Sequence, residues 1–311
     1  MIDKYDSFSI RSNAWIDKLR DAIVQRGLKD YPTVATFENK KCLLFLDGEF
    51  WGGMYDLVEK ASAYYIQSKY GIPKDDVVLI KNDELEEGSD ADFEELKDLV
   101  EFCKNADLSV KANYEKVASQ IDFESLMFDY AASLYTGIWD WPYRNCMFYR
   151  NSGKPIEGNP YSDGKWRLGM FDFDYSVGLT YASFGDVKGY AYDSFNSYFD
   201  KRNVFPVQIF DALMYIDEFR EEFARVVRSM GETVFEADKM RAIIEEQKEL
   251  INYMVATDWR WYSGTPEFEF DYYLKTKSEY FINALDEIIE FFDNRQEYVE
   301  QFLEKFLKEF E

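Results

Sequence analysis

Two short stretches of the sequence carry carboxylate and amide side chains at spacings that suit metal-assisted chemistry. The stretch WDWPYRN places Asp140 five positions before Asn145, and the stretch FDFDYSVG places Asp172 and Asp174 at the end of a short apolar run. A carboxylate can accept a proton from a hydroxyl group, and carboxylate and amide oxygens are ligands that hard cations prefer. These four side chains are the candidates for the chemistry of the chain.

Phosphoryl transfer is a reaction that uses these residue types in this order. In protein kinases an aspartate of the catalytic loop accepts the hydroxyl proton, an asparagine five residues later holds a metal ion, and a later Asp-Phe-Gly aspartate binds Mg²⁺. The Asp-x4-Asn spacing of Asp140 and Asn145 is a weak signal alone, because it recurs by chance. The Asp-Phe-Asp that follows downstream makes the pattern more specific.

The composition excludes several other classes of protein. Lys and Arg number 36 against 60 Asp and Glu, a net charge of −24, and so acidic a surface repels nucleic-acid phosphates. The sequence contains no histidine, which excludes Ser-His-Asp and Cys-His catalysis and His-ligated zinc. Cys42, Cys103 and Cys146 are odd in number and widely spaced, so we predict free thiols without a disulfide framework or zinc site.

Neither a membrane span nor a secretion signal is predicted. No apolar run approaches the roughly 20 residues that cross a bilayer. The N-terminal sequence MIDKYD lacks the basic start and apolar centre of a signal peptide. We therefore expect a soluble chain without membrane insertion, in a compartment that the sequence leaves open because it can be a fragment of a longer protein.

The beginning of the chain is predicted to be rich in strands. Residue alternation, an N-cap at Ser12-Asn13 and the turn dipeptide Asp47-Gly48 are the signals. The expected elements are a strand over 7–11, a helix over 14–26 that ends before Gly27, and a hairpin of strands over 42–46 and 51–58.

Helices predominate in the remainder. The expected elements are a helix over 59–69, a strand over 77–80, a solvated acidic loop over 82–88, helices over 92–103, 114–120 and 123–135, a hairpin of strands over 147–150 and 166–171, and helices over 206–212, 217–230, 236–257 and from 276 to the end. The last helix keeps an apolar stripe that predicts core packing. A small strand-rich beginning, a centre with a hairpin and a helical C-terminal half are the proportions of a two-lobed kinase.

Several segments, in order along nearly the whole chain, resemble the spore-coat CotH kinase family of atypical protein kinases. The segment LDGEFWGGMY (46–55) is similar to the family's LNGEYWGxY, and IIEFFDNR (288–295) is similar to its C-terminal FFxxR helix. Further resembling segments are Val58-Glu59, Tyr70-Gly71-Ile72, Ile121-Asp122, 140–145, Lys165-Trp166-Arg167 and 171–178.

The resemblance implies an α+β, two-lobed protein-kinase-like fold, with a partial small lobe over 1–60 and a larger lobe over 61–311. It implies an enzyme that binds ATP with Mg²⁺ or Mn²⁺ and phosphorylates Ser or Thr of a protein, with spore-coat proteins as candidate substrates. By position, Asp140 is the expected catalytic base, and Asn145 and Asp172 are expected metal ligands. Asp174 is either a second ligand or the true Asp-Phe-Gly equivalent; we favour Asp172 for that place.

The small lobe departs from the kinase pattern at the phosphate-binding lysine. The resemblance makes Val58, Glu59 and Lys60 the hinge that meets the nucleotide, and it puts Arg11 where the strand lysine belongs, with Asp17 or Asp21 as its acidic partner. An arginine is an unusual choice there, because its planar fork differs from a lysine ammonium. The alternative is that the lysine lies upstream, in first strands that this chain lacks; we favour a truncated or degenerate small lobe.

Two other functions remain open from the sequence. The first is a pseudokinase or structural coat protein that keeps the fold for interactions, which the missing lysine favours. The second is a phosphotransferase that acts on a small molecule or sugar. A spore-coat or extracytoplasmic location follows from the resemblance if the chain is a fragment. We rank the protein kinase first because its acidic and amide constellation is complete.

Overall fold

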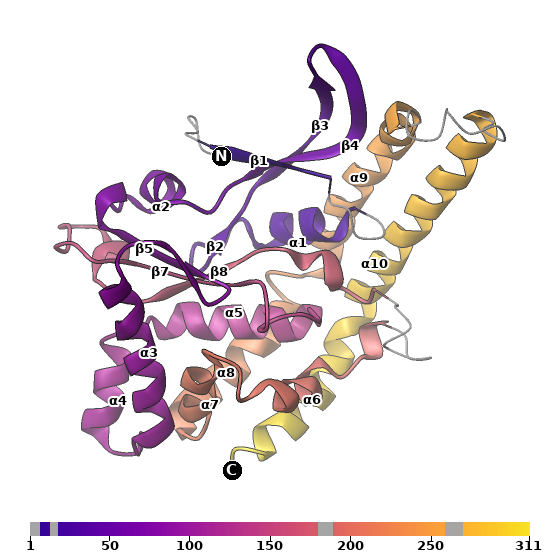
Figure 1. Cartoon of the computed structure of the whole chain (residues 1–311). Helices are drawn as coiled ribbons and strands as arrows, with labels where there is room; N and C mark the ends of the chain where they lie inside the picture. Colours follow the sequence, from indigo (N-terminus) through magenta and orange to yellow (C-terminus); the bar gives the residue numbers. More distant parts are fainter. Residues whose placement is uncertain (1–6, 13–17, 180–188, 259–269) are drawn as a thin grey trace.

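The computed structural model describes residues 7–12, 18–179, 189–258 and 270–311. Its smaller sheet has the strand order β1-β4-β3 and is antiparallel throughout (Figure 1). The strands are β1 (Phe8–Arg11), β3 (Asn39–Leu46) and β4 (Glu49–Glu59). Asp47 and Gly48 have φ of 51° and 81°, as a two-residue turn with two left-handed positions requires. The predicted hairpin is confirmed.

Helix α1 (Arg20–Leu28) begins later and ends later than predicted. The predicted start of this helix lies outside the described residues. Gly27 is inside the helix and not beyond its end, because its role is close packing: an added Cβ would lie 2.9 Å from the sulfur of Met240 on α9 (Ala237–Asp258). The apolar side chains of α1 belong to the same core as the helices of the C-terminal half.

The larger sheet has the strand order β2-β8-β7-β5-β6. Its strands are β2 (Ala35–Thr36), β5 (Val77–Lys81), β6 (Glu84–Glu87), β7 (Cys146–Asn151) and β8 (Arg167–Met170). The predicted β7–β8 hairpin is confirmed. The predicted acidic loop over 82–88 was wrong, since Asn82 and Asp83 turn the chain at φ of 51° and 63° and the acidic residues after them form the edge strand β6. Charged side chains suit an exposed sheet edge.

Glu59 ends strand β4 and does not begin a helix, which corrects the predicted helix over 59–69. It pairs with Phe8 of β1. Helix α2 (Ala63–Tyr70) begins only after Ser62, whose hydroxyl accepts a hydrogen bond from Tyr65 N at 3.2 Å. The last strand residue of the small sheet is thus followed by a short extended connection into the larger part of the molecule.

The rest of the chain is mostly helical, as predicted. Helix α5 (Phe123–Thr136) is buried from Ser125 to Thr136 and lies under the larger sheet (Figure 1). Helices α9 and α10 (Phe270–Lys308) run side by side, and α9 also contacts β4 (Figure 1). The other helices are α3 (Asp90–Asn105), α4 (Lys111–Ala118), α6 (Ser194–Tyr198), α7 (Val207–Met214) and α8 (Asp217–Met230). Within the described residues, none of the helices is both long and apolar enough to cross a membrane.

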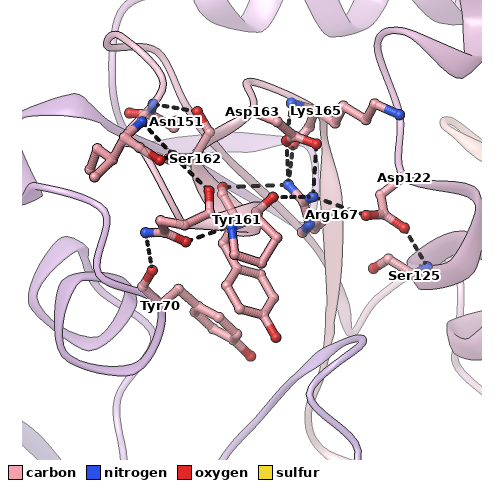
Figure 2. Close-up of polar contacts among 12 residues, drawn as sticks. Tyr70, Asp122, Ser125, Asn151, Tyr161, Ser162, Asp163, Lys165 and Arg167 are labelled. Atoms are coloured by element: carbon pink, nitrogen blue, oxygen red, sulfur yellow. Dashed lines mark hydrogen bonds and ion pairs between the residues drawn. The ribbon is translucent and has the colours of Figure 1, made fainter.

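A buried arginine fixes the loop between β7 and β8 (Figure 2). Arg167, whose side chain is 5% exposed, forms a two-pronged ion pair with Asp163 at 2.8 and 3.1 Å. The same guanidinium pairs with Asp122 at 3.0 Å and donates to Pro160 O at 2.9 Å. Asp122 in turn accepts a hydrogen bond from Ser125 N and caps α5. One side chain therefore ties the loop to the start of the central helix.

Replacing Arg167 with lysine is expected to lower the free energy of unfolding by about 2 kcal/mol, because a single ammonium cannot reproduce the fork and leaves buried acceptors unpaired. Urea unfolding followed by circular dichroism measures the change. Arg225→Lys is the matched control, since Arg225 is an exposed arginine on α8. Equal stability of the two variants would contradict the role given to Arg167.

Candidate active site

A cleft of about 370 Å³ lies between the two sheets. It brings together most of the residues singled out in the sequence: the predicted nucleotide-binding residues Arg11, Val58, Glu59 and Lys60 and the predicted metal ligands Asn145 and Asp172 all line it. The other residues that line it are Ser9, Asp21, Gln25, Phe37, Ala61, Leu79, Lys81, Asn82, Glu86 and Phe171. Asp140 and Asp174 are not among its lining residues.

Arg11 spans the cleft and binds the carboxylates of the FDFD segment. Its guanidinium lies 2.8 Å from Asp172 Oδ1 and 3.7 Å from Asp174 Oδ2. Burial lowers the pKa of Arg11, but the facing Asp172 outweighs this, so the pKa of Arg11 is raised above its usual value. Of its two predicted partners, Asp17 lies outside the described residues. Asp21 raises the pKa of Arg11 only through its charge, and its carboxylate binds another group.

Asp21 is buried and holds the backbone after Asp172. Its Oδ1 accepts a hydrogen bond from Phe173 N at 2.9 Å, and burial raises the pKa of its carboxyl group. One turn later on α1, Gln25 donates to Met170 O at 2.9 Å and accepts from Phe37 N at 3.0 Å. The sequence did not single out Gln25; its i+4 spacing from a buried aspartate on a short helix is the signal that was available. Helix α1 thus fixes the end of β8.

Asp172 and Asp174 lie in a turn and not in a strand, which corrects the prediction that strand alternation puts them on one face. Asp172 has φ of 63° and ψ of 57°, and a short 3-10 turn runs from Phe173 to Tyr175. Asn145 also has a positive φ, 62°, and its Nδ2 donates to Asp172 O at 3.2 Å. Left-handed conformations outside glycine are strained and cluster at functional sites. The hydrogen bond between Asn145 and Asp172 joins the two segments that the sequence singled out.

Asp174 is the more buried of the two aspartates, with 12% of its side chain exposed against 34% for Asp172. Burial, then the negative charges of Asp21 and Asp172, raise the pKa of Asp174 to about 7. Asp172 faces the cleft and Asp174 stands behind it next to Arg11. The geometry therefore favours Asp172 over Asp174 as the residue available to a ligand in the cleft.

The loop that carries Asp140 is held by a lysine that the sequence did not single out. Lys201 Nζ donates to Trp139 O at 2.7 Å and to Trp141 O at 2.6 Å, on either side of Asp140. Burial lowers the pKa of Lys201 to about 8. Asp140 Oδ1 is buried and has no hydrogen-bond partner among the described residues, and burial together with the charge of Asp172 raises the pKa of Asp140. Local sequence could not reveal Lys201, because it lies some 60 residues from the loop.

A second buried aspartate lies under the same loop. Within the part of the chain that the structure describes, Asp129 Oδ1 on α5 and the indole Nε1 of Trp141 are buried and have no hydrogen-bond partner. Burial raises the pKa of Asp129 well above its usual range, and the neighbouring Trp141 indole opposes this only in part. The native state therefore keeps the proton of the Asp129 carboxyl group to a higher pH than the unfolded chain, which releases it near pH 4.

This proton makes stability depend on pH with a definite sign. Because the folded-state pKa of Asp129 is raised, the native state binds more protons than the unfolded state above about pH 4, and stability falls as pH rises toward the folded pKa. The amide side chain of the variant Asp129→Asn does not titrate. As pH rises, the free energy of unfolding of this variant should therefore increase relative to that of the natural protein by up to about 1.4 kcal/mol per pH unit. Urea unfolding at pH 5 and pH 7 measures the difference, with exposed Asp98→Asn as control. The same difference at both pH values would contradict the prediction.

The site can contribute oxygen ligands to a cation but does not enclose one. Within the described part of the chain, no group of three or more Cys, Asp or Glu side chains is placed to hold a metal ion. Asp172 and Asn145 line the cleft. Arg11 binds Asp172 Oδ1, and Asn145 uses its amide nitrogen to bind Asp172 O, so that bond leaves the amide oxygen of Asn145 unused. Mg²⁺ is commonly bound by one or two protein ligands, with nucleotide phosphates and water completing the shell.

The fold and the site define a protein of the kinase-like class. Two sheets in the N-terminal half and a helical C-terminal half form an α+β, two-lobed kinase-like fold, and the end of β4 and the Asn145 and Asp172 segments line a cleft between the sheets. The family model described as CotH kinase protein matches residues 12–299, nearly the whole chain. The chain belongs to the CotH kinase family. A search of curated proteins found no match.

Proposed function

We propose that the chain transfers the terminal phosphoryl group of ATP to a serine or threonine hydroxyl of a protein, with Mg²⁺ or Mn²⁺ bound to the nucleotide. The observation that carries the proposal is the composition of the cleft. Residues from the end of β4, from β1 and from the segments around Asn145 and Asp172 line one hollow, although they are far apart in the sequence. Family membership supports a kinase-like reaction.

The nucleotide fits the cleft with its base toward the end of β4. Val58 and Glu59 end the strand, and Lys60 and Ala61 continue along the cleft wall. Val58, Phe37 and Leu79 offer apolar surface to a flat base. Arg11 and Lys81 offer positive charge two strand positions away, Arg11 after Ser9, the partner of Val58, and Lys81 after Leu79. This distribution of apolar and cationic groups matches a base at one end and phosphates at the other.

The residues present fit a nucleotide-bound divalent cation. Asp172 and Asn145 would hold it, and the metal would neutralise negative charge on the phosphates. Asp140 has the properties of a general base that takes the proton from the hydroxyl group of the substrate serine or threonine. Its Oδ1 has no hydrogen-bond partner, and burial makes its carboxylate more basic than an exposed one.

One observation favours the alternative of a pseudokinase or interaction protein. Arg11 already binds Asp172 at 2.8 Å, so a metal ion must compete with a guanidinium for this carboxylate. The buried Lys–Asp pair of the small sheet, Lys41 with Asp56 at 2.8 Å, does not line the cleft and cannot replace a phosphate-binding lysine there. We rank this alternative second because the other parts of the site are in place.

Radiolabelled ATP distinguishes the two functions. Incubating the chain with γ-labelled ATP, Mg²⁺ or Mn²⁺ and a Ser/Thr-rich acceptor protein is expected to label the acceptor or the chain itself on Ser or Thr. EDTA and Asp172→Ala should each abolish the labelling. Nucleotide binding without any transfer under either metal would contradict the kinase proposal and support the interaction protein.

A further inference from the structure

The cleft contains a lysine that the sequence pattern did not identify. Lys81 is the last residue of β5 and lies between Met147 of β7 and Glu84 of β6 in the sheet register. Its Nζ lies 4.3 Å from the centroid of the Phe171 ring, and Phe171 directly precedes Asp172 in the sequence. The sheet therefore fixes Lys81 next to the segment that carries the candidate metal ligands.

Among the described residues, Lys81 differs from Arg11 in forming no ion pair and from Lys60 in being partly buried. Arg11 is bound to Asp172 and Asp174, and Lys60 is exposed at the rim. Across the part of the chain that the structure describes, the ammonium group of Lys81 forms no hydrogen bond and no ion pair; its contact is the face of Phe171. Burial lowers the pKa of Lys81, and the negative charge of Glu86, which also lines the cleft, offsets this only in part.

A partly buried ammonium without a counter-ion is costly, and an anion that enters the cleft relieves that cost. Three acidic residues of the cleft are engaged elsewhere: Asp172 binds Arg11, Asp21 accepts from Phe173 N, and Glu59 Oε2 accepts from Glu38 N at 2.9 Å. The fourth, Glu86, acts on Lys81 through its charge but forms no ion pair with it among the described residues. A ligand that pairs with Lys81 places a negatively charged group in the cleft beside Phe171.

We propose that Lys81 binds the phosphates of the nucleotide from the floor of the cleft and supplies the ammonium that the small lobe does not provide. The proposal rests on the proposed nucleotide site and names a further binding residue in it. Lys81 comes from the larger sheet, beside Phe171 and Asp172, whereas the strand position of the small sheet carries Arg11. Arg11 holds Asp172 and Lys81 receives the phosphate charge.

Calorimetric titration with adenosine, ADP and ATP, each with Mg²⁺, separates a phosphate contact from a structural one. For Lys81→Met, ATP and ADP affinity should fall about 10- to 100-fold while adenosine affinity stays within about twofold, because only the phosphates carry the charge that the ammonium meets. Lys81→Arg should keep most of the preference for ATP over adenosine. Lys154→Met, an exposed lysine of the β7–β8 loop that does not line the cleft, should match the natural chain.

The outcomes are distinguishable. If Lys81→Met loses adenosine and ATP binding equally, Lys81 only supports Phe171. If ATP binding is unchanged, Lys81 does not contact the phosphates. Either result overturns the inference and leaves the nucleotide site in place. A natural chain that binds none of the three ligands overturns the nucleotide site and the inference with it. If the melting curve shows that Lys81→Met does not fold, Lys81→Gln, which has a neutral polar side chain, is judged by the same criterion.

Discussion

Replacing Asp140 with asparagine is expected to lower the rate of phosphoryl transfer by about 10²- to 10⁴-fold, the usual contribution of a general base. Asparagine keeps the shape of the side chain but cannot accept the hydroxyl proton. The loop should stay in place, because Lys201 binds the backbone oxygens on both sides of residue 140 and not its carboxylate. The affinity for ATP is expected to change little, since Asp140 does not line the nucleotide cleft.

Transfer from γ-labelled ATP at saturating nucleotide measures the effect of Asp140→Asn. The matched control is Asp98→Asn, because Asp98 is an exposed aspartate on α3, away from the cleft. A fall in rate with unchanged ATP affinity fits a residue that acts on the acceptor. A full rate in Asp140→Asn would remove Asp140 from the proposed chemistry and leave the nucleotide site untouched.

Replacing Arg295 with methionine is expected to lower the free energy of unfolding by at least about 3 kcal/mol, because it leaves several buried acceptors unpaired. Arg295, on α10, is fully buried, and burial lowers the pKa of its guanidinium to about 10. It donates to the backbone oxygens of Tyr135 at 2.7 Å and Leu134 at 3.1 Å, at the end of α5. The same side chain donates to Ser194 Oγ at 2.7 Å.

The contacts of Arg295 give the prediction a second part. The guanidinium also binds Tyr190 O and Tyr192 O, at 2.8 and 2.7 Å, so it holds the segment before α6 against the helix that leads into the Asp140 loop. Loss of stability should therefore be accompanied by loss of order in this segment, measured as faster amide hydrogen exchange over residues 189–194.

The control for Arg295 is Arg241→Met. Arg241 on α9 is 44% exposed and pairs with Asp293, and a surface pair of this kind contributes about 0–1 kcal/mol. Urea unfolding of the two variants compares a buried network with a surface pair directly. A loss in Arg295→Met no larger than in Arg241→Met would show that the network does not hold the C-terminal half together.

The local patterns predicted most of the elements that form the site. Asp47-Gly48 specified the small-lobe hairpin because two left-handed positions leave few alternatives, and periodicity placed α8 over 217–230 as the structure has it. The resemblance named Asn145 and Asp172 as metal ligands, and the structure joins these two residues by a hydrogen bond. The roles assigned to these residues, and the division of the chain at residue 60, stay predictions.

The interpretations that failed involve long-range packing. Gly27 looked like a helix end, but its missing side chain makes room for Met240, more than 200 residues away. The acidic segment after Lys81 looked like a solvated loop, but pairing with β5 makes it a strand. Spacing within a segment does not encode such pairings.

The same limit applied to the site. Lys81 meets Phe171 and Lys201 meets the Asp140 loop only because sheets and helices bring distant parts of the chain together. Arg11 was expected to pair with an aspartate close by in the sequence, whereas its partner is Asp172, 161 residues away. Charge complementarity across a cleft is set by the fold and leaves no local signal.

The central claim is that the cleft binds a metal–nucleotide complex through Asp172. The measurement that tests it most directly is a thermal-shift titration with ATP in the presence and absence of Mg²⁺ or Mn²⁺, because a ligand that binds only the folded state raises the melting temperature by mass action. We expect an ATP-dependent rise in melting temperature that is larger with the metal and that loses its metal dependence in Asp172→Ala. No rise at millimolar nucleotide with either metal would contradict it.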